Sequence, residues 1–340
     1  MLDFSTEDLP PEQRFEHWRE MRAKNLFGVT IELPRERRDR FHGIFRAQAL
    51  GTAVASDMRA SAYDVSRTRT DIARITGNSL CIGLQVLGPG ALDIGSDRVE
   101  TVHEGDMTIG HSDQPYAGRP HSSKDFHFRL LRIPIDDELT LGRLVDDMPS
   151  AKPARDKATM LPFRALFDAL TVGRPDVADP GADITHISRL ALALRDRLPS
   201  RTPEVRAAVR GGLRYAALDI LDRHSRRPDL TPVMVAHMLA ISVRQLHILF
   251  EETGESFART LSRKRGQAAH DMLLCRPDSS VTEIAFACGF DSLATFYRAF
   301  RSLYGMAPGD VRACGIEAVR PSRSPPDRTC MRRATDTPAP

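Results

Sequence analysis

Two segments near the C-terminal end carry basic, amide and hydroxyl side chains at the start of a helical pattern. Their outer positions are, in the first segment, Val243, Arg244, Gln245 and His247, and in the second, Leu293, Ala294, Thr295, Tyr297, Arg298 and Arg301. Guanidinium and amide groups at the start of a helix are suited to reach base edges in the DNA major groove, and further cations meet phosphates. The two segments therefore predict a surface for duplex DNA.

The first segment belongs to a pair of short predicted helices. Thr231 is a capping residue followed by proline at the first helical position, and residues 240–242 form a tight turn in which Ser242 caps the next helix. The inward positions of that second helix, at i, i+3 and i+4, are Leu246, Leu249 and Phe250. Two short helices joined by a three-residue turn form a helix-turn-helix.

The same plan returns about fifty residues later in the chain. Thr282 is expected to cap a helix, residues 288–290 form the turn, and Ser292 precedes the second helix. The inward positions of this helix are Phe296, Ala299 and Phe300. An internal repeat of this kind is stronger evidence than either copy alone.

Residues 256–275, between the two copies, form an amphipathic stripe. Its apolar positions are Phe257, Leu261, Ala268, Met272 and Leu273. A helix of about twenty residues is roughly 30 Å long, close to the turn of about 34 Å that separates successive major-groove entries. One helix is thus expected to hold both reading helices, which are the second helices of the two helix-turn-helix pairs. Arg263 and Lys264 on this connecting helix are expected to contact phosphates. Gly266 lies inside it at a cost of roughly 1 kcal/mol.

The C-terminal part resembles a known family. The pattern is Ile284-Ala285-x-x-Cys288-Gly289-Phe290-Asp291-Ser292-x-x-x-Phe296-x-Arg298-x-Phe300-Arg301-x-x-x-Gly305-x-x-Pro308. It closely resembles the C-terminal signature of AraC/XylS-type transcription regulators, and the resemblance extends over residues 205–315. It implies that Arg298 and Arg301 touch DNA, that the phenylalanines form the core, and that RNA polymerase is a partner. Ala294 and Ile248 depart from the family's usual polar residues.

The first 135 residues have a different pattern of apolar and turn-forming residues. Residues 1–27 are predicted to be helical through Phe15, Trp18, Met21 and Leu26. Short apolar stretches at 81–87, 91–94, 107–109 and 126–133 then alternate with turn signals, which predicts a β-sandwich or barrel. The whole chain is thus expected to be an α+β two-domain protein, with a β-rich N-terminal domain flanked by helices and an all-α C-terminal domain.

The β-rich part also resembles, over short patterns, the cupin-like binding domain of one branch of the same family. These patterns are Gly-Pro-Gly-x-Leu at 88–92, Glu-Gly-Asp-Met at 104–107 and Asp-Gln-Pro-Tyr at 113–116. The resemblance implies a small-molecule effector, aromatic or nitrogen-containing, of otherwise unknown identity. Tyr63, Tyr116 and Phe126 are candidates to line its pocket, with ordinary core packing as the alternative.

Composition argues against several other classes of protein. The five cysteines form no Cys-x-x-Cys pair, which argues against a disulfide framework or a cysteine zinc site and favours a reducing cytoplasm. The usual His-x-His of metal-binding cupins is missing, so we expect no metal, no cofactor and no enzyme activity. No apolar run is long enough for a membrane span. Residues 201–340 hold 21 Lys and Arg against 15 Asp and Glu, which favours a polyanionic partner for this end.

These observations predict three parts. Residues 1–199 form a cupin-like sensor domain whose helices, at about 161–199, mediate dimerisation; residues 205–315 bind DNA; residues 316–340 are a disordered tail. Leu190, Leu194 and Leu198 form a stripe that is either packed on its own barrel or shared with a second subunit, and we favour a homodimer that shares it.

The leading hypothesis is a ligand-responsive transcription regulator, an activator of a catabolic operon. The first alternative is a cupin-type metal-dependent oxygenase carrying a DNA-binding tail. A second is DNA alkyl-damage repair, against which the missing four-cysteine zinc cluster argues.

Overall fold

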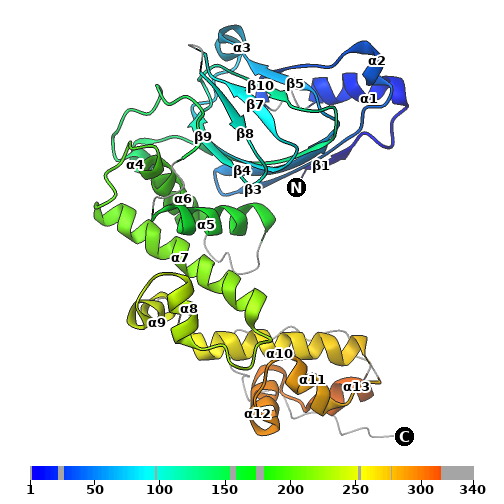
Figure 1. The fold of residues 1–340 in the computed structure, drawn as a ribbon, viewed down its shortest axis with the longest axis vertical. Coiled ribbons are helices and arrows are strands. Elements are labelled where there is room, and N and C mark those ends of the chain that lie inside the picture. The colour runs from blue at the N-terminus through cyan, green and yellow to red at the C-terminus, as the bar shows by residue number, and fades with distance from the viewer. Residues whose placement is uncertain are drawn as a thin grey trace, which may run out of the picture. The chain divides into compact units, whose positions relative to one another are not determined.

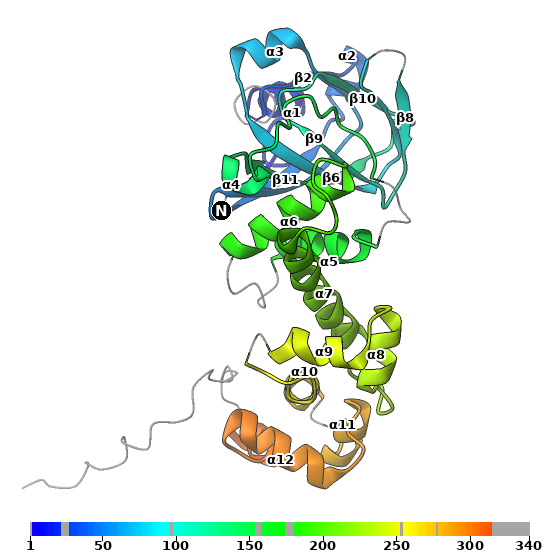
Figure 2. The ribbon, with the colours of Figure 1, turned by 90° about the vertical axis from the view of Figure 1, so that its left-hand side faces the viewer.

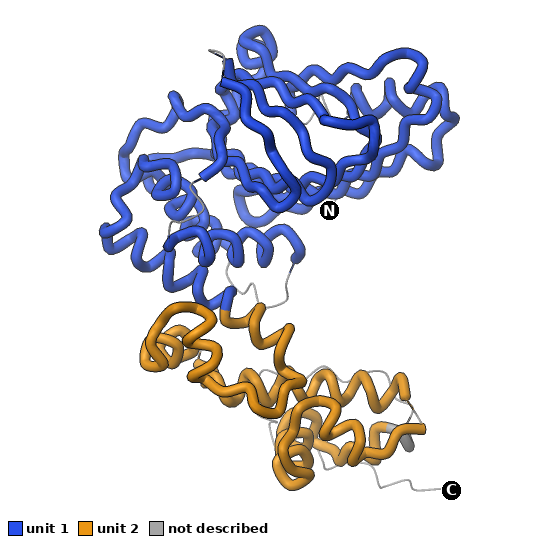
Figure 3. Tube along the Cα trace, viewed as in Figure 1, with its two compact units in different colours: residues 1–216 blue, residues 217–340 orange. Residues whose placement is uncertain are grey.

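The chain folds into two compact units, residues 1–216 and 217–340 (Figure 3). The computed structural model describes residues 2–21, 27–95, 98–153, 158–173, 180–251, 254–276 and 278–314. The division between the units falls inside helix α7 (Pro203–His224), whereas the sequence predicts the domain boundary between residues 199 and 205. The expected domain limits stay a prediction, and the expected tail at 316–340 lies outside the described residues.

Two antiparallel sheets face each other in the N-terminal unit (Figure 1). The six-stranded sheet runs β1 (Leu2–Ser5), β3 (Gly43–Leu50), β4 (Ala53–Ala60), β11 (Phe126–Pro134), β6 (Ser79–Leu87) and β9 (Met107–His111), and the five-stranded sheet runs β2 (Thr30–Glu32), β5 (Asp64–Arg67), β10 (Tyr116–Pro120), β7 (Gly90–Asp93) and β8 (Val99–Val102). The apolar stretches predicted as strands fall in β6, β7, β9 and β11. The predicted fold class is therefore confirmed.

Strand β11 shows how side-chain alternation separates two environments. Successive side chains of a strand point to opposite faces. On one face Phe126, Phe128, Leu130 and Arg132 line a cavity between the sheets. On the other face Leu131 and Ile133 are fully buried, and helix α5 (Met160–Val172) lies against β11 and β4 on this outer side (Figure 1). The strand is thus mainly apolar on both sides, with Arg132 at one end of the cavity face and with His127 and Arg129 paired to Asp57 on the outer face.

The start of the chain is not one helix. Leu2–Ser5 form β1, which pairs antiparallel with β3 about forty residues later, and only Pro11–Trp18 form helix α1. Trp18 is fully buried, and a Cβ on Gly43 would meet its ring at 2.7 Å. The prediction of a helix over 1–27 is therefore wrong at its first residues, and its Leu26 lies outside the described ones. The other short helices of the unit are α2 (Arg35–Arg38), α3 (Arg69–Arg74) and α4 (Asp137–Thr140).

The leucine stripe belongs to the core of the N-terminal unit. Leu190 and Leu194 lie on α6 (Pro180–Leu194), which packs against α5, and Leu198 follows directly. All three are buried within the single chain, Leu194 to 2% exposure. The stripe is therefore not the free surface that a second subunit would need, and the expectation that a homodimer shares it is wrong.

The C-terminal unit holds two helix-turn-helix pairs joined by one long helix. Its helices are α8 (Pro232–Met238), α9 (Val243–Glu251), α10 (Phe257–Cys275), α11 (Val281–Ala287), α12 (Leu293–Tyr304) and α13 (Pro308–Cys314). Figure 2 views α10 nearly end-on, with α8 and α9 on one side and α11 and α12 on the other. The predicted caps Thr231, Ser242 and Ser292 are confirmed. The cap of α11 is Ser280, in a reciprocal box with Glu283, and not Thr282.

The glycine inside α10 is explained by close packing. Gly266 is buried, and a Cβ at this position would lie 2.4 Å from Cδ1 of Leu303 on α12. Its backbone freedom costs roughly 1 kcal/mol, but it lets α12 approach the connecting helix.

No single described helix is long and apolar enough to cross a membrane. Only α8 and α9 together meet the length and composition needed, and they are bent by 98° relative to each other.

Leu194→Ala is expected to lower the free energy of unfolding of the N-terminal unit by about 2–5 kcal/mol, because it leaves a cavity in the core. The fluorescence of Trp18, the single tryptophan, reports urea unfolding of this unit. Val172→Ala on α5, where the side chain is 59% exposed, is the control and should change stability by less than about 0.5 kcal/mol. An equally mild effect of both substitutions would contradict the buried stripe.

Candidate DNA-binding surface and ligand cavity

Helix α9 separates a buried face from a polar one. Leu246, Leu249 and Phe250 are buried, as the repeat predicts. The opposite side exposes Arg244, Gln245, His247 and Ile248, while Val243 is half-buried. Residues at the start of such a helix are those that contact base edges in helix-turn-helix complexes. The fold therefore presents most of the first predicted group to solvent on one helix face.

Gln245 has a second role that the sequence reading missed. Its side-chain oxygen accepts a hydrogen bond from the backbone N–H of Ser242 at 2.9 Å, and the backbone N–H of Gln245 donates to the Ser242 hydroxyl at 3.1 Å. This is a reciprocal capping box, which satisfies two backbone donors at the start of α9. The spacing of serine and glutamine, three residues apart, is the signal that identifies it. Part of the hydrogen-bonding capacity of Gln245 is thus used inside the helix.

Helix α12 exposes a more basic face. Ala294, Thr295, Arg298 and Arg301 are exposed, and Phe296 and Phe300 are fully buried, as expected. Leu293 and Tyr297 are half-buried and pack against the core of the second helix-turn-helix. Their predicted DNA contacts would therefore involve only part of each side chain. The Thr295 hydroxyl lies 2.9 Å from that of Ser292, within the cap.

Two predicted phosphate contacts on α10 are held in ion pairs. Arg263 pairs with Glu255 at 3.1 Å, and Lys264 pairs with Asp222 and is only 9% exposed in its side chain. By contrast, the guanidinium groups of Arg244, Arg298 and Arg301 have no hydrogen-bond or ion-pair partner within the described part of the chain. The arginines of α9 and α12 are therefore better placed for an external anion than those of α10.

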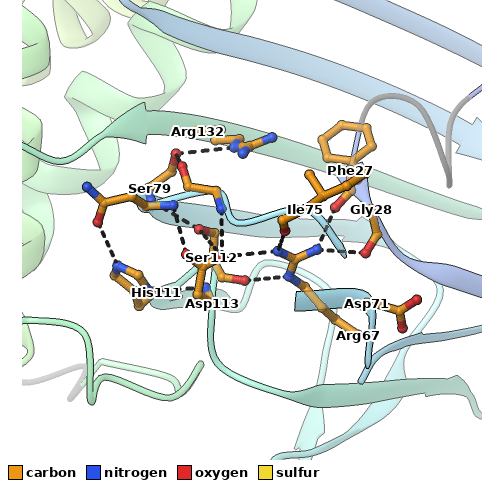
Figure 4. Close-up of polar contacts among 12 residues, drawn as sticks. Phe27, Gly28, Arg67, Asp71, Ile75, Ser79, His111, Ser112, Asp113 and Arg132 are labelled. Atoms are coloured by element: carbon orange, nitrogen blue, oxygen red, sulfur yellow. Dashed lines mark hydrogen bonds and ion pairs between the residues drawn. The ribbon is translucent and has the colours of Figure 1, made fainter. Parts of the chain in front are cut away.

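A cavity of about 230 Å³ lies between the two sheets. All three candidate residues, Tyr63, Tyr116 and Phe126, line it. Further lining side chains that the sequence reading did not single out include Met58, Cys81, His111, Phe128 and Arg132. The alternation along β11 is a signal that would have found Phe128 and Arg132. The cavity has aromatic walls. Figure 4 shows the polar contacts of four further lining residues, Arg67, His111, Ser112 and Arg132, which form a polar end.

Arg67 organises this polar end (Figure 4). Its guanidinium is 4% exposed and donates hydrogen bonds to the backbone carbonyls of Phe27, Gly28, Ile75 and Ser112 at 3.0, 2.6, 2.7 and 2.6 Å. It also pairs with Asp113 at 3.0 Å. A buried cation needs such complete pairing, since an unpaired one costs several kcal/mol. One side chain thereby ties together segments that are far apart in the sequence.

Asp113 is the anionic partner in this network. Burial alone would raise its pKa, but hydrogen bonds from the backbone N–H groups of Asn78 and Gly77 and from Arg67 and Ser112 outweigh burial. The pKa of this carboxyl is therefore lower than its ordinary value. A carboxylate that accepts several such bonds is held in its charged form. Asp113 therefore stays ionised opposite Arg67 across the physiological range.

Two histidines of this unit, His111 and His127, have protein partners. His111 accepts a hydrogen bond from the Asp113 backbone N–H at 3.1 Å, its other nitrogen lies 3.4 Å from Asn78, and burial lowers its pKa, so it is neutral near pH 7. His127 lies 2.8 Å from Asp57. No three described histidine, cysteine, aspartate or glutamate side chains are grouped to hold a metal ion. Burial also raises the pKa of Cys81 to about 11, so its thiol stays protonated.

Residues 235–313 match the model of a family described as a helix-turn-helix domain. The transcriptional activator NphR of Rhodococcus sp. is 25% identical over 283 residues, which cover 81% of this chain and 82% of NphR. The HTH-type transcriptional activator RhaS of Klebsiella pneumoniae is 40% identical over 86 residues, 25% of this chain and 30% of RhaS. Residues 235–313 therefore form an AraC-type helix-turn-helix domain, and the chain is similar to known transcriptional activators.

Several curated relatives are matched over only part of their length. The chain spans between 27% and 37% of RhrA, CdhR, GlxA and the RhaS proteins. Among solved structures, the AraC-like transcriptional activator CuxR is 21% identical, with a TM-score of 0.47, over 84% of this chain and 100% of CuxR. The predicted AraC-type helix-turn-helix region is confirmed over residues 235–313.

Asp113→Asn is expected to destabilise the N-terminal unit at pH 7 by about 1–3 kcal/mol, because it leaves Arg67 and backbone donors poorly paired. The pKa of Asp113 is lower in the folded chain than in the unfolded one. Its contribution is therefore complete above about pH 4 and is lost as the pH falls through the folded pKa. Urea unfolding followed by Trp18 fluorescence between pH 3 and pH 7 measures it.

The matched control is Asp64→Asn on β5, which removes an exposed carboxylate from the strand that carries Arg67. This variant should keep both the stability and the acid sensitivity of the parent. If the stability of Asp113→Asn fell below pH 4 as steeply as the parent's, the loss of stability in acid could not be assigned to Asp113.

Proposed function

We propose that this regulator controls transcription by binding duplex DNA through α9 and α12 and a small effector in the cavity of its N-terminal unit. The observation that carries the proposal is the pair of helices that expose Arg244, Arg298 and Arg301 without protein partners in a unit of the AraC type. We further propose that it acts as an activator in contact with RNA polymerase, in the cytoplasm. The similarity to NphR and RhaS, which are both transcriptional activators, supports this role.

The geometry of the C-terminal unit favours two successive groove contacts. Helix α10 has 19 residues, so it is about 28 Å long. One turn of DNA is about 34 Å, and the two reading helices pack at either side of α10 (Figure 2). A single chain can therefore place α9 and α12 in neighbouring major grooves without a second subunit.

The cavity supports an effector with an aromatic body and an anionic end. Tyr63, Tyr116, Phe126 and Phe128 supply aromatic surface, and Arg132 lies six residues beyond Phe126 on the same face of β11. At about 3.3 Å per residue this separation is roughly 20 Å along the strand, enough for a ring and a carboxylate to lie along one wall. Pockets for small ligands combine apolar walls with a few polar groups in this way.

A homodimer remains part of the proposal, with an interface outside the leucine stripe. The exposed side of α5, which carries Leu161 and Val172, is available on the single chain. The alternative of a metal-dependent oxygenase has no supporting observation among the described residues, because none of their side chains are grouped to hold a metal.

DNA binding by the full chain should weaken steeply with salt, because cations that neutralise phosphates release counterions. Fluorescence anisotropy on a preferred and a random duplex separates two roles. Arg244→Ala should cost about 1–3 kcal/mol on the preferred duplex and little on the random one, whereas Arg298→Ala should weaken both and reduce the salt slope by about one. Arg206→Ala, an exposed arginine of the N-terminal unit, is the control. Uniform loss for Arg244→Ala would refute its role.

Benzoate is a suitable probe of the cavity, and benzyl alcohol is its uncharged counterpart. Calorimetric titration of the full chain should show tighter binding of benzoate, and Arg132→Gln should weaken benzoate about tenfold or more, because a charge-assisted hydrogen bond is worth roughly 1.5–3 kcal/mol. Arg59→Gln on the neighbouring strand β4 removes an exposed arginine and is the matched control. Equal binding of both probes, or an equal effect of both variants, would contradict the proposed effector class.

A further inference from the structure

The two reading helices can be aligned on their capping serines. Counted from Ser242 and Ser292, the buried positions agree: position 4 is Leu246 or Phe296, and position 8 is Phe250 or Phe300. The two helices therefore have the same phase relative to the core. Equal positions along them point outward in the same way.

The exposed positions of the two helices carry opposite chemistry. Position 2 is Arg244 in α9 and Ala294 in α12; position 6 is Ile248 in α9 and Arg298 in α12; position 9 is Glu251 in α9 and Arg301 in α12. All six side chains are exposed, and Ile248 has 37% of its surface in solvent. The arginine and the apolar side chain have thus changed places between the helices.

The distance between positions 2 and 6 on the helix can be compared with the spacing of bases along DNA. Positions 2 and 6 are one turn apart, about 6 Å along the axis, which is close to two base steps of about 3.4 Å. Arginine makes its commonest specific contact with guanine, and apolar side chains contact the methyl group of thymine. In α9, an arginine at position 2 and an apolar side chain at position 6 therefore favour a guanine and a thymine about two steps apart.

The charges of the two faces differ as well. At the three positions compared, α9 carries one arginine and one glutamate, whereas α12 carries two arginines and no acid. Neither Arg298 nor Arg301 is paired with another described residue. The second helix thus has the larger attraction for phosphates, and the first has the larger capacity to discriminate between bases.

We propose that the two helices read two unlike DNA boxes about one turn apart. In the first box Arg244 contacts guanine and Ile248 contacts a thymine methyl about two steps away. In the second box Ala294 contacts a thymine methyl, and Arg298 and Arg301 bind mainly phosphate. This inference rests on the proposed DNA contacts of α9 and α12, and it adds the base composition that each one recognises.

Selection of duplexes from a random-sequence library by the full chain tests the exchange directly. The parent should enrich one box with a guanine and a second, weaker box with a thymine but without a required guanine. Ala294→Arg should add a guanine preference of about 5- to 150-fold in the second box, since a bidentate contact is worth about 1–3 kcal/mol. This variant changes an exposed side chain, and its thermal unfolding should match the parent's.

Ala287→Arg is the matched control, because it adds the same charge at an exposed position of α11, outside the reading helix. It should raise affinity for every sequence and create no new base preference. If Ala294→Arg behaved like this control while the parent still selected a sequence, the inference would fail and the DNA-binding function would stand. If the parent enriched no sequence at all, the proposed function itself would fail.

Replacing thymine by uracil in the selected duplex tests the methyl contacts. Uracil keeps the pairing and lacks only the methyl group, so each lost contact should weaken binding about fourfold, the equivalent of roughly 0.8 kcal/mol. The loss should occur at one thymine in each box and disappear in Ile248→Gly for the first box alone. No loss at any thymine of either box would overturn the assignment of Ile248 and Ala294.

Discussion

The serine cap at the start of each reading helix is the constraint on which the DNA-binding surface depends. Ser242 and Ser292 each accept a hydrogen bond from the backbone N–H three residues on, which sets where the first helical turn begins. Burial of the aromatic or leucine side chains at fixed distances from that cap then fixes the rotation of the helix. What faces outward follows from these two conditions, so the functional side chains can vary without loss of the fold.

The same reasoning explains why the C-terminal unit could be predicted from its sequence and parts of the N-terminal unit could not. A helix-turn-helix is defined by contacts within about twenty residues, which periodicity and caps reveal. The capping residue of α11 was misplaced because Ser280 and Thr282 are both good caps, and only the reciprocal bond with Glu283 decides between them. Strand β1 was missed because its four residues owe their conformation to β3, far along the chain.

The leucine stripe and the cavity show a further limit of sequence reading. A periodic apolar stripe states that a surface is buried, but not what covers it; here the rest of the same unit covers Leu190 and Leu194. The network around Arg67 is even harder to predict from the sequence, because its acceptors come from three separate segments and three of them are backbone carbonyls of apolar residues or glycine. No pattern of side chains records such a set.

A division of labour between the two reading helices is physically sound because α10 joins them in one unit. Once the first helix is bound, the second meets its groove as an intramolecular event, so even contacts without base preference raise the affinity of the whole. Phosphate binding by Arg298 and Arg301 suits this role, since phosphates are present at every position. The loss of sequence specificity caused by one weakly discriminating helix is then small. The sequence is selected by the contact of Arg244 with its base, and the second helix raises the affinity for the site that the first has selected.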